Sequence, residues 1–65
     1  MTKEELELIA NALQSSKENF EREADLFDKK QERPAMVAYL RNELIPKLDE
    51  AYKIVKIKYY TAKGQ

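Results

Sequence analysis

Carboxylates are the first residues of this chain that could do chemistry. Glu4, Glu5 and Glu7 crowd the start, and such a cluster could hold a hard cation or transfer protons. The chain has no histidine and no cysteine, so the commonest general base, the commonest metal ligand and the thiolate nucleophile are absent. Ser15 and Ser16 therefore have no such base to activate them. We interpret the glutamates as the solvated first turn of a helix.

Other signatures of catalysis or cofactor binding are also missing from the sequence. The chain has one glycine, which excludes a glycine-rich phosphate loop, and it contains no nucleophile elbow and no metal-ligand spacing. We therefore expect a protein that is not an enzyme, with no catalytic residue, no cofactor and no metal site.

The last part of the chain is basic and carries tyrosines. Lysines there could neutralise phosphates, and tyrosine rings could stack on unpaired bases. Alternatively, Tyr52 and Tyr59 lie on or beside an apolar stripe, and the lysines cover its rim with their aliphatic stems. We prefer the second interpretation and keep nucleic-acid binding as the alternative function. The residues that would contact nucleic acid are Lys53, Lys56, Lys58, Tyr60 and Lys63.

The element that positions the first half of the chain is a helix predicted over residues 3–32. Thr2, with Glu5 three residues later, forms a capping box, and no glycine or proline interrupts the segment. Its leading apolar residues recur every seven positions, which indicates one buried stripe. The stripe consists of Leu6, Leu13, Phe20 and Phe27, with Ile9, Ala10 and Ala24 between them.

A second helix is predicted over residues 35–62. Pro34 ends the first helix and suits the first position of the next. Pro46 interrupts the second helix on the side opposite its stripe, so we expect a kink; two shorter helices split at Ile45 are the alternative. Residues 52–61 also show strand periodicity, but a lone strand would have no partner. The second stripe consists of Val37, Leu40, Leu44, Leu48, Ala51, Val55, Tyr59 and Ala62.

These elements predict an all-α fold in a single domain, residues 1–65. A turn at about residues 32–34 is short enough to make the helices antiparallel neighbours. Residues 1–33 carry a net charge of −3 and residues 34–65 a net charge of +3, so attraction between the acidic and basic ends favours the same hairpin modestly. Because two helices enclose no interior, we expect an antiparallel homodimer that forms a four-helix bundle.

A second apolar surface is predicted on the hairpin, away from the stripes. In a hairpin folded near residue 32 or 33, Leu8 lies level with Ile57, and Leu26 lies level with Tyr39. These four residues are the predicted contacts for a second protein. The leading hypothesis is therefore a small non-enzymatic interaction module, such as an adaptor, inhibitor, chaperone or assembly factor. Without a signal peptide or a membrane-spanning apolar run, we expect it in the cytoplasm.

Overall fold

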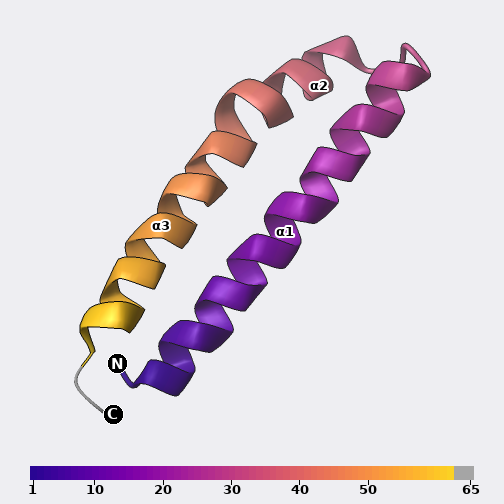
Figure 1. The fold of residues 1–65 in the computed structure, drawn as a ribbon. Helices are drawn as coiled ribbons and strands as arrows, with labels where there is room; N and C mark the ends of the chain where they lie inside the picture. The colour runs from indigo at the N-terminus through magenta and orange to yellow at the C-terminus, as the bar shows by residue number, and fades with distance from the viewer. Residues whose placement is uncertain (63–65) are drawn as a thin grey trace.

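The computed structural model describes residues 1–62 and folds them into an antiparallel helical hairpin (Figure 1). The first arm is α1, Lys3–Lys29. The second arm is one continuous helical path: α2, Pro34–Tyr39, then the π-helical segment η1, Leu40–Leu44, then α3, Ile45–Thr61. The described residues include no strand, so the all-α hairpin is confirmed. The segment with strand periodicity is part of α3.

The predicted capping box starts α1. The Thr2 backbone N–H donates to Glu5 Oε1 at 3.0 Å, and the Glu5 backbone N–H donates to Thr2 Oγ1 at 3.2 Å. These two bonds satisfy backbone donors that the first helical turn leaves free. The bond from the Thr2 backbone also holds the pKa of Glu5 below its ordinary value. Glu5 therefore has a structural role as an ionised cap.

The predicted end of α1 at residue 32 is wrong by three residues. The Glu32 N–H donates to the Phe27 carbonyl at 2.9 Å, and the Gln31 N–H donates to the Asp28 carbonyl at 3.0 Å. These bonds make a Schellman motif, which needs a left-handed residue, and Gln31 supplies it with φ of 58°. The turn therefore occupies residues 30–33. This motif is not predicted from the sequence, because residue 31 is glutamine and the usual residue at the left-handed position is glycine.

The turn contains a second left-handed residue, directly before the proline. Arg33 has φ of 49° and ψ of 56°, which avoids the right-handed helical region that a following proline disfavours. Its guanidinium carbon lies 5.3 Å from the centre of the Phe27 ring. Pro34 then takes the first position of α2, one residue earlier than predicted.

The second arm bends at η1 instead of breaking at Pro46. The Ile45 N–H donates to the Leu40 carbonyl, which is the five-residue spacing of a π-helix. Pro46 comes directly after this segment and has no N–H to give to the preceding turn. Figure 1 shows the arm changing direction between α2 and α3 and following α1. The expected kink is present, in the form of a π-helical turn, and the split into two separate helices is wrong.

The π-helical turn also rotates the side chains that follow it. A π-helical turn takes more residues than an α-helical turn, so the inward side of α3 moves toward later residues. Leu44 and Ile45 are consecutive, yet both are half-buried. Farther along, Asp49, Tyr52 and Lys56 become half-buried beside the predicted stripe. A purely α-helical interpretation of the sequence misses Asp49 and Lys56, whereas Tyr52 is already expected on or beside the stripe.

The core lies mainly near the turn. The buried apolar side chains of the described residues all belong to the predicted stripes: Leu6, Ala10, Ala24, Val37 and Leu40. Ala24, Val37 and Leu40 form one cluster, around which pack Phe20, Phe27, Met36, Leu44 and Ile45. By contrast, α3 has no buried residue. The sequence predicts Ile9 on the first buried stripe, but Ile9 lies at the edge of that stripe and is 37% exposed.

Candidate functional site

One side of the hairpin, here called the paired face, carries the ion pairs that join the two arms. Arg41 of η1 donates from Nη2 to Asp25 Oδ1 at 2.9 Å and from Nη1 to Asp28 Oδ2 at 3.2 Å. The hydrogen bond to Asp25, followed by the one to Asp28, raises the pKa of Arg41 above its ordinary value. All three side chains are exposed to solvent, so each pair adds little stability.

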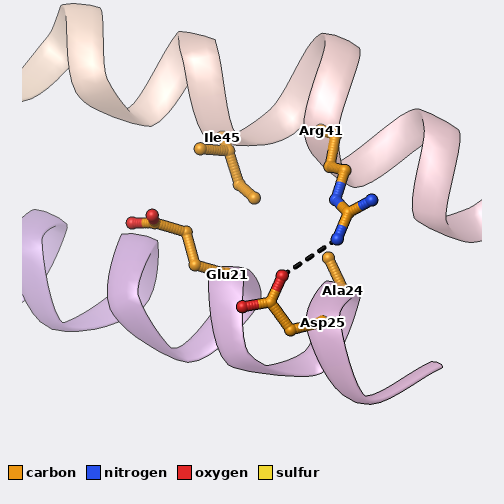
Figure 2. A pocket seen from close by; sticks show the side chains of 5 residues that line it. All are labelled: Glu21, Ala24, Asp25, Arg41 and Ile45. Atoms are coloured by element: carbon orange, nitrogen blue, oxygen red, sulfur yellow. Dashed lines mark hydrogen bonds and ion pairs between the residues drawn. The ribbon is translucent and has the colours of Figure 1, made fainter. Parts of the chain in front are cut away.

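A small open pocket lies beside this ion pair on the paired face. Its volume is about 180 Å³, and Figure 2 shows the side chains that line it, with Arg41 reaching across from the second arm to Asp25. The lining holds two carboxylates, and that of Asp25 is bound by Arg41. The pocket is lined by Glu21, Ala24, Asp25, Arg41 and Ile45.

A second bridge on the paired face joins α1 to α3. Lys17 Nζ lies 3.0 Å from Asp49 Oδ1, and Lys53 Nζ lies 3.0 Å from Asp49 Oδ2. The hydrogen bond from Lys17, then that from Lys53, lowers the pKa of Asp49, and the bond to Asp49 raises the pKa of Lys17.

The tyrosines near the end of α3 gather around one lysine. Lys56 Nζ lies 5.0 Å from the centre of the Tyr60 ring, 5.3 Å from that of Tyr59 and 5.9 Å from that of Tyr52. Lys3 Nζ, from the start of α1, lies 5.2 Å from the same Tyr59 ring. These are cation–π distances, so the rings hold lysines of their own chain. Tyr52 and Tyr59 are half-buried, in agreement with the interpretation that places them on or beside the apolar stripe.

The residues expected to contact nucleic acid have different surroundings in the structure. Lys53 is paired with Asp49, and Lys56 lies against the tyrosine rings. Lys58 and Tyr60 are exposed. Lys63 lies outside the described residues.

The expected attraction between the two chain ends produces no ion pair within the described part of the chain. Neither Glu4 nor Glu7 forms a salt bridge there, and Glu5 is held by the cap of α1. The lysines across from these glutamates use Asp49 and the tyrosine rings instead. Charge at the ends therefore adds less to the hairpin than the sequence indicates.

The opposite side of the hairpin, here called the apolar face, carries the outer edges of both stripes. By helical periodicity, Ser16, Phe20 and Phe27 of α1 lie on one side of the buried Ala24. Asp25 and Asp28 lie on the other side. The side chains of this face are half-buried: Leu13, Ser16, Phe20 and Phe27 from α1, with Leu44, Leu48, Ala51 and Val55 from the second arm. This face is the main candidate for binding another chain.

The four predicted partner contacts lie away from the core. Leu8, Leu26, Tyr39 and Ile57 are between 50% and 69% exposed. Because η1 lies between Tyr39 and Ile57, the eighteen residues that separate them are no longer five α-helical turns, so these two side chains do not form one straight ridge. Ile54, which sequence reasoning missed, is also exposed. A signal for it exists, since it is an isoleucine outside the apolar stripe.

The described residues contain no group of three potential ligands that could hold a metal ion. No helix within residues 1–62 has the length and apolarity needed to cross a lipid bilayer. Comparison with protein-family models, with curated proteins and with solved structures finds no match for this chain. A functional proposal must therefore rest on the faces of the hairpin.

Proposed function

We propose that this chain is a small non-enzymatic interaction module that acts through its helix faces. Its first partner is a second copy of itself, and the product is a four-helix bundle. A further protein then binds the outward apolar residues. The observation that carries the proposal is that every stripe residue of α3 is half-buried and none is fully buried, because apolar side chains gain stability only when water is removed from them.

The single chain exposes more surface than a compact monomer of its mass, which supports the binding of a partner. The chain exposes 5013 Å², whereas a compact monomer of 7.7 kDa exposes about 4,300 Å². The excess, about 700 Å², is close to the roughly 800 Å² that each partner buries in a standard interface. The radius of gyration, 14.6 Å, likewise exceeds the roughly 11 Å of a compact chain of this length.

The distribution of charge points to the face on which this partner binds. Each ion pair between the two arms lies on the paired face, where bound water and salt are tolerated. The apolar face carries aromatic and aliphatic side chains without such pairs among the described residues. Covering it desolvates few charges, which keeps the cost of association low.

The outward residues suit a second, different protein. Leu8 and Leu26 lie on α1 almost opposite the side that faces the second arm, so a dimer formed through the apolar face leaves them free. Their large exposure without an internal role makes them the proposed contacts, together with Tyr39 and Ile57. The recognition would be that of an amphipathic helix laid in or on an apolar groove.

Nucleic-acid binding has weaker support. Lys56 is held by three tyrosine rings and Lys53 by Asp49, so phosphates and bases must displace contacts that already exist. Titration of fluorescent single-stranded oligonucleotides at about 0.15 M salt tests it. We expect no sub-micromolar binding. Tight binding that weakens steeply with salt would instead support the nucleic-acid function.

Thermal melting at several chain concentrations tests the proposed self-association. When folding requires a second copy, mass action raises the melting temperature as the concentration rises. We expect the midpoint from circular dichroism to rise steadily between about 5 and 500 μM. A midpoint independent of concentration, with full helix content at the lowest concentration, would contradict the proposal.

A further inference from the structure

We propose that the side of α3 directed away from α1 binds an amphipathic helix of another protein, and that acidic residues flank the apolar line of that helix. This surface is where the second protein of the proposed function would dock, so the site rests on that function and adds the place and the chemistry of the partner. The surface, here called the outer side of α3, consists of Lys53, Ile54, Ile57, Lys58 and Thr61.

The outer side of α3 carries large apolar side chains that the described part of the chain leaves in water. Ile54 is 49% exposed and Ile57 is 63% exposed. Ile57 follows the half-buried Leu48 by nine residues, about two and a half turns, so these two side chains point to opposite sides of the helix. Figure 1 shows α1 running along one side of α3. Apolar residues on opposite sides are typical of a helix that is covered on both.

Thr61 extends the apolar line of the outer side by one turn. Its hydroxyl donates to the Ile57 carbonyl at 3.0 Å and to the Lys58 carbonyl at 3.2 Å, so its proton is already used within the helix. The methyl group is then the part of this side chain that is left for contact. Ile54, Ile57 and Thr61 are separated by three and four residues, which is the spacing of side chains that dock one helix on another.

Lysines lie at both edges of this apolar line. Lys53 precedes Ile54 and Lys58 follows Ile57, and these are the flanking positions at which charges select a partner helix. Lys58 forms no salt bridge among the described residues, and Lys53 remains 71% exposed although it is paired with Asp49. No acidic residue occurs between Ile54 and Thr61. A partner helix with glutamate or aspartate at its own flanking positions would therefore meet charges of opposite sign.

A second copy of this chain fits the outer side of α3 poorly. Pairing two α3 helices there would bring the lysines of both copies together, and like charges repel. The outward side of α1 offers no matching apolar line, because polar residues separate Leu8 from Leu26 on that side. These polar residues are Asn11, Ser15 and Asn19. The occupant is therefore a different protein.

An anionic membrane is the other surface that attracts basic and apolar residues. A helix that lies in a membrane interface buries a broad apolar face, whereas the broad apolar face of α3 packs on α1. The outer line consists only of two isoleucines and a threonine methyl group, and the exposed Glu50 lies one turn before it. A line this narrow matches the side of one helix better than the surface of a membrane.

Binding to two designed peptides tests the site. The probe is a fluorescently labelled helical peptide of about three heptads, with leucine at its seam positions and glutamate at the flanking positions. The matched control peptide has lysine at the flanking positions, and like charges keep each peptide from pairing with itself. Fluorescence anisotropy at about 0.15 M salt measures both with the full chain. We expect the glutamate peptide to bind at least about tenfold more tightly than the lysine peptide.

Two variants of the chain locate the contacts. Lys58→Glu should lower the preference for the glutamate peptide at least about fivefold, whereas Lys29→Glu, the same charge change at an exposed position of α1, should leave it unchanged. Ile57→Ala should weaken binding of the glutamate peptide about fivefold, because the isoleucine is central to the apolar line. Circular dichroism of each variant is recorded first. The comparison of the two peptides uses the unmodified chain, so it decides the question even if a variant does not fold.

The remaining outcomes separate this site from the proposed function. Equal binding of the two peptides, or no binding while the melting midpoint still rises with chain concentration, would overturn the acidic partner and leave self-association standing. Loss of binding on Leu8→Ala but not on Ile57→Ala would move the second protein to α1 and overturn the site on α3. Cosedimentation with phosphatidylserine vesicles in the absence of peptide binding would assign the surface to a membrane and also contradict the proposal.

Discussion

The two ends of the hairpin differ in how far the chain completes its own core. Near the turn, Ala24 of α1 meets Val37 and Leu40 of the second arm, and all three are buried. Toward the chain ends, Leu6 and Ala10 of α1 are buried, but α3 contributes no buried residue. The turn end therefore has a core that the chain completes by itself. At the other end, here called the open end, the apolar side chains of α3 are only half-buried.

This difference follows from the path of the second arm. At the turn, α2 and η1 approach α1 with small and medium side chains, so Ala24 admits close contact. Beyond η1, the π-helical turn rotates the inward side toward Asp49, Tyr52 and Lys56, whose polar atoms must stay near the surface. The open end is therefore the part of the hairpin that would gain most from the proposed second chain.

The largest effect is expected from removing an aromatic ring at the turn end. Phe20 packs against the buried cluster, so Phe20→Ala should lower the free energy of unfolding by about 3 kcal/mol. Urea unfolding followed by circular dichroism measures this. Leu26→Ala, at an exposed position of the same helix, is the control and should change it by less than about 0.5 kcal/mol. Equal effects of the two changes would show that the turn-end core is assigned wrongly.

At the open end, Leu48→Ala tests whether α3 depends on a second chain. Leu48 is half-buried in the single chain, but would be covered in the dimer, so we expect a loss of about 2 kcal/mol. The melting midpoints of the variant and the parent should both rise with chain concentration, because mass action favours the folded dimer. A small loss, together with midpoints that do not move with concentration, would mean that α3 is as complete as the turn end.

A stabilising change is expected within the turn itself. Gln31 has φ of 58°, which costs a residue with a Cβ about 1 kcal/mol relative to glycine, so Gln31→Gly should raise the unfolding free energy by about that amount. Lys30→Gly is the matched control, because Lys30 has φ of −82° and gains nothing from glycine. If both changes destabilise equally, the Schellman motif does not form in solution.

The smallest effect on stability is expected from removing the Lys17–Asp49 bridge between the arms. The pKa of Asp49 lies below its ordinary 3.8 because of Lys17 and then Lys53. The folded state therefore binds the proton more weakly than the unfolded state, and the stabilisation is present above pH 3.8 and is lost as the pH falls through the folded pKa. Asp49→Asn should remove this part of the acid sensitivity, which melting between pH 5 and about pH 2 would detect. An unchanged pH profile would show that the bridge is absent.

Much of this fold could be predicted from residue types and spacing. Thr2 and Glu5 identify the start of α1, and Pro34 identifies the start of the second arm, because each provides a local backbone signal. The stripes then place the two arms face to face. The buried residues Ala24 and Leu40 follow from helical periodicity alone.

The rest depends on tertiary packing that no local pattern encodes. Glutamine is an unusual residue in the left-handed position, so the end of α1 is predicted too late in the chain. The π-helical turn before Pro46 is equally unexpected, so the inward side of α3 is predicted at residues that come too early in the chain. The cation–π cluster around Lys56 depends on that rotation and was foreseen only as a tyrosine-rich basic end. The outward residues Leu8 and Ile57 remain a prediction for a partner.

Sedimentation equilibrium of the unmodified chain tests the central claim most directly. If the open end is completed by a second copy, the folded protein should have twice the chain mass of 7.7 kDa at about 100 μM. A fully helical species of the single-chain mass at that concentration would contradict the account, because the hairpin would then be stable with its apolar face in water.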